Sequence, residues 1–174
     1  MFITIEKTIM QETIGDIFNF LQDPQTDAIC IFTNGMTNNQ GLAMAGAGQA
    51  GIASSKWTNF RSRLGRHLRE NGNIVGLLGE INKEGKLINR QEKSNNPSLI
   101  SFPTKQHFLN PSIPKLIEQS AKQLVEIANN LRLNKVILGR AGCGFATGRL
   151  NWENDVKPIL ADIFNDRFVI VNME

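Results

Sequence analysis

The sequence predicts one domain of the α/β class, a layered sheet with helices on both of its faces. Apolar residues along the chain follow in turn the two-residue period of strands and the 3.6-residue period of helices. The chain has 174 residues, the size of a domain with a single core, and no repeat or linker divides it. With 41% hydrophobic and 20% charged residues, its composition is that of a globular protein. We therefore expect residues 1–174 to form a single domain.

Six segments have the patterns of strands. Residues 2–9, FITIEKTI, alternate like a strand, whereas residues 27–33, DAICIFT, form a compact apolar run that suits a strand covered on both faces. Residues 83–86, KEGK, predict a turn into a short returning piece of chain. The other predicted strands are residues 73–81, 98–102, 135–139 and 167–171.

Helical patterns separate these strands. One apolar stripe runs from Trp57 to Leu68 and is expected to stop at Asn71-Gly72. The next helix is expected to have Ser112 as its cap and Pro114 in its first turn, followed by apolar residues at the spacing of a face packed on a sheet. A further helical pattern comprises Val156, Ile159, Leu160 and Ile163.

Charge and cysteine content limit the function classes. The net charge of +3, from 19 Lys and Arg against 16 Asp and Glu, is too mild to indicate nucleic acid and permits an anionic ligand. Cys30 and Cys143 have no partner at a metal-ligand spacing, which fits reduced thiols in a reducing compartment and no metal site. With no signal-peptide pattern and no apolar segment long enough to span a bilayer, the sequence predicts a cytoplasmic protein without membrane contact.

Two glycine-rich loops directly follow predicted buried strands. Residues 33–51, TNGMTNNQGLAMAGAGQAG, and residues 141–148, AGCGFATG, are short of bulky side chains. Ligands of open α/β sheets bind outside the carboxyl ends of the strands, where exposed main-chain amides can cradle a phosphate. One such loop alone is more often a tight turn, but two loops at one edge indicate a diphosphate ligand. The acidic residue of the dinucleotide fingerprint and the GK[ST] of a P-loop are both missing, which disfavours hydride transfer.

Several segments together resemble the macro domain superfamily, whose members bind ADP-ribose. The resemblance covers roughly residues 27–171, and its most specific pieces are GRAGCGFATGRLNWE and the PTK of SFPTKQHF. The chain is similar to macro-like proteins of bacteria and phages and to the lysine-dependent branch that removes ADP-ribose from protein or DNA. The resemblance implies a three-layer α/β/α macro domain with a mixed, mostly parallel central sheet. The other similar segments are TDAICIFTNG, NPSIPKLIEQSAKQL, VKPIL and DRFVIV.

The resemblance also implies ligand-binding residues. Asn34 matches the asparagine near the distal ribose, and Asp16 of the pair Gly15-Asp16 matches the family's contact to adenine. The loop from 41 to 51 would wrap the diphosphate and distal ribose, and residues 142–148 would close the other side. The residues of these loops that are predicted to bind are Gly41, Gly46, Ala47, Gly48, Gly142, Cys143, Gly144, Phe145, Ala146, Thr147 and Gly148.

Two residues are candidates for catalysis. Thr104-Lys105 matches the Thr-Lys pair that supplies the reactive amine in the lysine-dependent branch, so Lys105 is the predicted nucleophile toward the anomeric carbon. His107 is the candidate acid or base, provided that the strand continues to place it on the same face. Without the resemblance, Lys105 is interpreted as a solvated charge and His107 as a surface histidine. The branch has an aspartate just after GCG, where this chain has Phe145-Ala146-Thr147, so binding is better supported than catalysis.

The favoured function is binding of ADP-ribose or a related NAD-derived nucleotide diphosphate, with hydrolysis of an ADP-ribosyl linkage on a modified substrate. Two alternatives are a non-catalytic module that senses or sequesters such a nucleotide and a phosphatase for ADP-ribose-1″-phosphate. Direct nucleic-acid binding is less favoured, since a basic run is usually a solvated face. The sequence implies no cofactor and leaves the oligomeric state open. The basic run comprises Lys56, Arg61, Arg63, Arg66 and Arg69.

Overall fold

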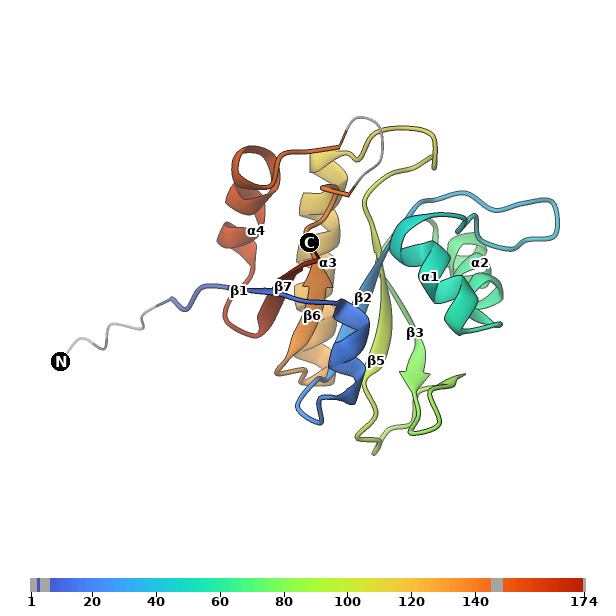
Figure 1. Cartoon of the computed structure of the whole chain (residues 1–174), viewed down its shortest axis with the longest axis horizontal. Coiled ribbons are helices and arrows are strands. Elements are labelled where there is room, and N and C mark those ends of the chain that lie inside the picture. Colours follow the sequence, from blue (N-terminus) through green and yellow to red (C-terminus); the bar gives the residue numbers. More distant parts are fainter. Residues whose placement is uncertain (1–2, 4–6, 145–148, 174) are drawn as a thin grey trace.

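The computed structural model describes residues 3, 7–144 and 149–173. They form a seven-stranded sheet with the strand order β1-β7-β6-β2-β5-β3-β4 (Figure 1). The sheet is mixed and mostly parallel, because only the pairs β3–β5 and β3–β4 are antiparallel. The strands are β1 Gln11–Ile14, β2 Ala28–Thr33, β3 Gly76–Ile81, β4 Leu87–Ile88, β5 Ser98–Pro103, β6 Val136–Gly139 and β7 Phe168–Asn172.

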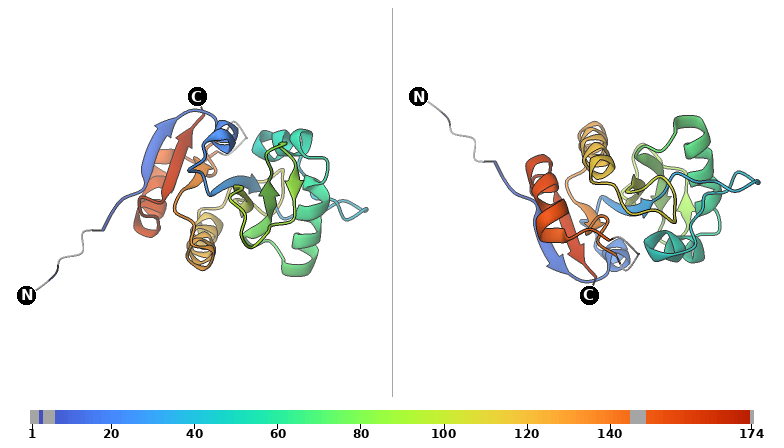
Figure 2. Two further views of the ribbon diagram at one scale, coloured as in Figure 1. Left: turned by 90° about the horizontal axis from the view of Figure 1, so that it is seen from below. Right: turned by 90° about the horizontal axis from the view of Figure 1, so that it is seen from above.

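Helices cover both faces of this sheet, as the sequence predicts. Figure 1 shows α3 and α4 on one side of the strands and α1 and α2 on the other, and Figure 2 shows α1 and α2 around the end of the sheet opposite β1 and β7. No helix in the described part of the chain is both long and apolar enough to cross a bilayer. The helices are α1 Gly48–Lys56, α2 Phe60–Asn71, α3 Pro114–Leu131 and α4 Lys157–Ile163, with a 3₁₀ helix at Ile17–Gln22 and a π-helical turn at Trp152–Val156.

The central strand β2 contributes side chains to two separate cores. Cys30 is fully buried on the α3 side together with Phe102, whereas Ile29 and Ile31 are fully buried on the α1 side together with Leu64. Each large apolar side chain buried in this way stabilises the fold by about 2 kcal/mol. Burial on both faces explains why the predicted strand at 27–33 is a continuous apolar run rather than an alternating one.

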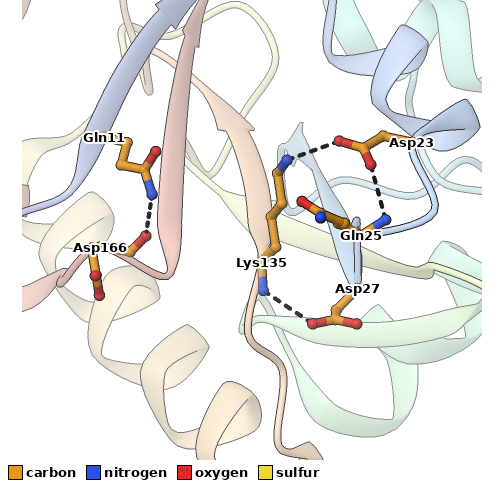
Figure 3. Close-up of polar contacts among 6 residues, drawn as sticks. All are labelled: Gln11, Asp23, Gln25, Asp27, Lys135 and Asp166. Atoms are coloured by element: carbon orange, nitrogen blue, oxygen red, sulfur yellow. Dashed lines mark hydrogen bonds and ion pairs between the residues drawn. The ribbon is translucent and has the colours of Figure 1, made fainter.

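Polar contacts close the amino edge of the sheet, where its parallel strands begin (Figure 3). Asp27 Oδ2 accepts hydrogen bonds from the main-chain N–H groups of Asn134 at 2.6 Å and Lys135 at 3.0 Å, just before β6. Lys135 Nζ lies 2.8 Å from Asp23 Oδ2. These contacts fix β2 beside β6 at this edge, so any separation of the two strands must occur toward their carboxyl ends.

The strand predicted at residues 2–9 is wrong for the residues described there. Ile3 and residues 7–9 are not in a strand, and the first strand begins at Gln11. Gln11 pairs with Val169 and β7 begins at Phe168, so β7 has no residue in register with the described residues 7–9. The alternating pattern was therefore present without a partner strand to pair with.

Two helix starts also differ from the prediction. Residues 48–51, predicted as loop, are the first turn of α1. This helix consists largely of small residues, so the sequence shows no helical period of apolar residues there. The cap residue of α3 is Ile113, whose side chain makes no capping hydrogen bond, so the prediction of Ser112 as the cap is wrong by one residue. Pro114 does lie in the first turn, where its missing N–H group has no helical partner to lose.

Candidate functional site

The strands β2 and β6 separate toward their carboxyl ends. They pair only through Ala28 with Val136 and Ile29 with Ile137, whereas β2 pairs with β5 as far as Thr33. We call the space between the unpaired ends of these strands the β2–β6 opening. The chain leaves β2 toward α1 on one face and leaves β6 toward α4 on the other, which is the switch point where open α/β sheets bind ligands.

Both predicted loops lie at this carboxyl edge. The strands β1, β7, β6, β2 and β5 are parallel in that order, so their carboxyl ends share one edge of the sheet. Residues 34–47 follow β2, residues 140–144 follow β6, and Asp16 and Lys105 lie two residues beyond β1 and β5. The fold therefore brings together residues that the sequence separates by more than a hundred positions.

Asn34, the first residue after β2, fixes the shape of its own loop. Its Nδ2 donates to the main-chain oxygen of Met44 at 2.9 Å, and its Oδ1 accepts from the main-chain N–H of Met36 at 3.0 Å. The side chain thus joins both ends of the loop that leads to α1. In this structure Asn34 is a support for the loop, and any contact to a ligand must be made alongside or in place of these bonds.

The start of α1 offers uncapped amides to an anion. The cap residue Ala47 has no side-chain hydrogen bond to the helix, so the main-chain N–H groups of its first turn have no side-chain partner. Gly48 has a φ of +60°, and apart from the adjoining residues no heavy atom of the described part of the chain lies within 4 Å of a Cβ built on Gly46 or Gly48. Amides at a helix start with open space before them suit a phosphate. A hollow of about 480 Å³ runs along this helix and is lined by Gly46, Ala47, Gly48, Gly51, Ile52, Ser55 and Lys56.

Gly41 lies apart from these residues. It has a φ of +77° and closes a turn whose main chain packs on α2. Its carbonyl oxygen accepts a hydrogen bond from Arg69, and the same oxygen touches the place that a Cβ on Gly65 would occupy. The structure thus positions Gly41 against α2, away from Gly46 and Gly48 at the start of α1.

The second loop requires glycine for packing as well as for access. Gly142 has a φ of +72°, and a Cβ there would lie 2.9 Å from Ser112 Cβ, 3.0 Å from Leu150 Cδ1 and 3.1 Å from Ile117 Cδ1. Gly144, by contrast, has no heavy atom of the other described residues within 4 Å of such a Cβ. Gly142 therefore allows the loop to pack closely on α3, whereas Gly144 has space beside it. The predicted contacts of Phe145, Ala146, Thr147 and Gly148 lie outside the described residues.

Cys143 is a half-buried thiol. Its Sγ donates to the main-chain oxygen of Ala141 at 3.3 Å. Burial raises the pKa of the Cys143 thiol to about 11, although the charge of Arg140 opposes the shift. A thiol with so high a pKa is a poor nucleophile at neutral pH, so its packing role in the loop is the better interpretation.

Lys105 lies at the carboxyl edge beside the end of β2. The main-chain N–H of Thr104 donates to Thr33 O at 3.1 Å, which extends the β2–β5 contact one residue beyond the strand. The main-chain oxygen of Lys105 accepts from Asn73 Nδ2 at 3.1 Å. Neighbours on two sides therefore fix the backbone of this half-buried lysine.

The strand does not continue as far as His107, as a role for this residue as acid or base would require. The strand β5 ends at Pro103, and His107 lies in a turn. Its Nδ1 accepts from the main-chain N–H of Leu109 at 3.1 Å, and its ring stacks on Phe108 with the centroids 4.5 Å apart. Only Nε2 remains for a substrate, and it belongs to a side chain held within its own turn.

Asp16 caps the 3₁₀ helix that follows β1. Its Oδ1 accepts from the main-chain N–H of Phe18 at 2.9 Å, and the preceding Gly15 is tied to Asn172 at the end of β7 by a 3.0 Å main-chain bond. This helix contacts both β2 and β6. The carboxylate therefore lies at the same edge of the sheet as the two loops.

The basic residues of α2 mostly bind the protein itself. Arg61 Nε donates to Ala43 O at 2.8 Å, Arg63 Nη1 donates to Leu78 O at 2.9 Å, and Arg69 donates to Gly41 O. These guanidinium groups hold the first loop and β3 against the helix. The arrangement gives a structural reason for the basic run and weakens its interpretation as a nucleic-acid surface.

Sequence reasoning overlooked Gln49 and Asn73. Gln49 Oε1 accepts from the main-chain N–H of Phe32 at 3.1 Å, and Asn73 Nδ2 donates to Gln106 Oε1 at 3.0 Å as well as to Lys105. Both side chains bridge segments that meet only in the folded chain, so no sequence signal could have identified them. Across the described ranges, no group of three or more His, Cys, Asp and Glu side chains is placed to hold a metal ion.

The structure is an α/β/α domain whose strands β2 and β6 separate at the carboxyl edge of the sheet. No sequence profile of a protein family matches the chain, and no curated protein matches it. Solved structures do match. The macrodomain of Mycobacterium tuberculosis DarG is 20% identical with a TM-score of 0.71, over 96% of this chain and 99% of that one.

Two further structures agree with that match. The macrodomain of Thermus aquaticus DarG is 20% identical with a TM-score of 0.65, over 95% of this chain and 99% of that one. Thermosipho africanus DarTG in complex with ADP-ribose is 16% identical with a TM-score of 0.72, over 93% of this chain and 41% of that one. The chain therefore has the fold of the macro domain superfamily, as its sequence resemblance implied.

Proposed function

We propose that this protein binds ADP-ribose at the β2–β6 opening. The observation that carries the proposal is that residues 34–47 and 140–144, which belong to two glycine-rich loops, follow strands that end at one edge of the sheet, and that the first of these segments leads into the uncapped start of α1. Amides at that helix start are donors for a diphosphate. The solved complex of Thermosipho africanus DarTG with ADP-ribose, which shares the fold, supports the choice of ligand.

Each part of the ligand has a candidate partner. The main-chain N–H groups of Gly48 and Gln49 would bind the diphosphate, and the loop held by Asn34 would lie along the distal ribose. Asp16 would accept from the adenine amino group, as the resemblance implies. Cys143 and Gly144 would close the other side with main-chain atoms. This assignment extends the geometry of the edge to a ligand, with the family resemblance as its guide.

We further propose that Lys105 removes ADP-ribosyl groups from a modified substrate. Its free amine would form a bond to the anomeric carbon while the bond from that carbon to the acceptor breaks, and the acceptor leaves with a proton. Water would then displace the amine, which releases ADP-ribose and restores the lysine. The position of Lys105 beyond β5, beside the end of β2, supports this role.

A non-catalytic sensor is the second candidate, and a specific observation favours it. The GCG triplet is followed by Phe145-Ala146-Thr147, which contain no carboxylate. His107 Nδ1 is already engaged by Leu109. Without an acid beside the leaving group, protonation would depend on water or on the substrate, which slows the chemical step. This arrangement suits a protein that binds the nucleotide and keeps it.

Calorimetry and a turnover assay test these proposals separately. Titration with ADP-ribose should give saturable heat, and titration with NAD shows whether an intact dinucleotide also fits. ADP-ribosylated protein and DNA should then be incubated with wild type, Lys105→Ala and the exposed-lysine control Lys83→Ala. Release by wild type and Lys83→Ala but not by Lys105→Ala is expected for the hydrolase. Binding without release by any of them would establish the sensor instead, and no heat with either ligand would remove the binding proposal.

A further inference from the structure

The main-chain N–H of Phe32 has an acceptor from outside the sheet. Phe32 lies three residues beyond Ile29, the last residue of β2 that pairs with β6. Its N–H donates at 3.1 Å to the side-chain Oε1 of Gln49, a residue in the first turn of α1. The amide of Gln49 thus takes the place that a carbonyl oxygen of β6 would have in a continuous ladder.

The same amide group lies between the separated strands. A Cβ built on Gly139, the last residue of β6, would lie 2.7 Å from Gln49 Nε2 and 3.2 Å from Phe32 Cε2. Gln49 Nε2 also lies 3.8 Å from Met173 Sδ, just after β7. Gln49 therefore lies against β2, β6 and the end of β7, and a side chain at position 139 would displace its amide from this place.

We propose that Gln49 is a positioning residue that keeps β2 and β6 apart at the binding edge. A part-buried N–H without an acceptor is unfavourable. Without Gln49, a hydrogen bond from the Phe32 N–H to a carbonyl oxygen of β6 would be favoured, and that bond would bring the two strands closer together. The side chain instead satisfies Phe32 and fixes the first turn of α1 over the opening. Because an amide is uncharged, it does this without repelling an anionic ligand. The effect on ligand affinity rests on the proposed binding of ADP-ribose, whereas the effect on the strands does not.

Amide hydrogen exchange tests the effect on the strands without any ligand. In Gln49→Leu the Phe32 N–H loses its acceptor, and its exchange should become about tenfold faster. In Gln49→Glu a carboxylate oxygen accepts the same bond, so the N–H should stay protected. Gln119→Leu, the same substitution on the exposed face of α3, is the matched control. Unchanged exchange at Phe32 in Gln49→Leu would overturn the proposal.

Affinity for ADP-ribose then tests whether this positioning serves the site. Gln49→Leu should bind about tenfold more weakly than Gln119→Leu at a temperature where both are folded. Gln49→Glu should also bind at least about tenfold more weakly, although its Phe32 amide remains protected, because a carboxylate would then face the diphosphate. Wild-type affinity in both Gln49 variants would overturn the link to binding. If the wild type bound no ADP-ribose, the proposed function would fail, while the exchange rates would still decide what Gln49 does to the strands.

Discussion

Asn34 and Met44 are joined by a hydrogen bond from Asn34 Nδ2 to the main-chain oxygen of Met44, 2.9 Å long. Between them the chain runs out over α2 and returns, so this bond closes the base of the loop (Figure 1). The turn at Gly41 is held separately by Arg69. The loop that leads to α1 is therefore fixed at two points, one at the binding edge and one on α2.

Replacing Asn34 should weaken both the loop and the site. Asn34→Ala removes two hydrogen bonds, and we expect a loss of about 1–2 kcal/mol in the free energy of unfolding. Affinity for ADP-ribose should fall about tenfold, because the start of α1 is then less well positioned. Urea denaturation and calorimetry measure the two effects. Asn39→Ala, an exposed position of the same loop, is the control, and equal behaviour of the two variants would contradict the role of Asn34.

Two glycine substitutions should separate access from packing. Gly46→Ala adds a methyl group to open space, so the stability should be unchanged while affinity for ADP-ribose falls as the group enters the site. Gly142→Ala places a methyl group against Ser112 at a φ of +72° and should cost about 2 kcal/mol or more of stability. Thermal denaturation with and without ADP-ribose distinguishes them. If ADP-ribose stabilised Gly46→Ala as much as it stabilises wild type, the ligand would have to bind elsewhere.

The arginines of α2 should matter for stability rather than for nucleic acid. Arg61→Ala removes the bond to Ala43 and should lower the free energy of unfolding by about 1–2 kcal/mol. Arg66→Ala, on the exposed side of the same helix, should change it by less than about 0.5 kcal/mol. Wild-type binding to unmodified DNA should be weak with a shallow salt dependence. A steep salt dependence whose slope falls by about one in Arg66→Ala would restore the nucleic-acid interpretation.

Glu80 should make stability depend on pH. It is 1% exposed on β3, and its carboxylate accepts from Gln91 N at 3.2 Å and from Asn96 Nδ2 at 3.1 Å. Burial raises the pKa of Glu80, but these hydrogen bonds, with Ser94 and the charge of Arg90, outweigh it and hold the pKa below its ordinary value of 4.5. A lowered pKa in the folded state stabilises the fold above pH 4.5, and this contribution is lost as the pH falls through the lowered value.

Glu80→Gln should therefore lower the free energy of unfolding by about 2 kcal/mol at pH 7, with a smaller difference below pH 4.5. Urea denaturation across this pH range measures the effect. Glu126→Gln, on the exposed face of α3, should differ little from wild type at any pH. If the free energy of unfolding of Glu80→Gln stayed below that of wild type by the same amount down to pH 3, the Glu80 carboxylate would not be the source of the pH dependence.

The elements with a strong periodic pattern were predictable. The continuous apolar run at 27–33 gave β2 because both of its faces are buried, and the stripe ending at Asn71-Gly72 gave α2 with Gly72 as its cap. The start of α1 could not be predicted, because GQAG has no apolar stripe and the packing of α1 on β2 is not visible in the sequence. Residues 2–9 had a strand pattern, but a strand also needs a neighbour, and β7 begins too late to pair with the described residues 7–9.

The sequence by itself determined the class of the domain, the strands that would be central and the two loops poor in side chains, because each of these is a property of local composition and period. Tertiary structure alone decided that Asn34 binds its own loop, that the arginines of α2 bind carbonyl oxygens and that Gln49 stands between β2 and β6. Hydrogen bonds of this kind join residues that become neighbours only when the sheet and its helices have assembled. Their partners are set by distance in space, which a periodic pattern along the chain does not encode.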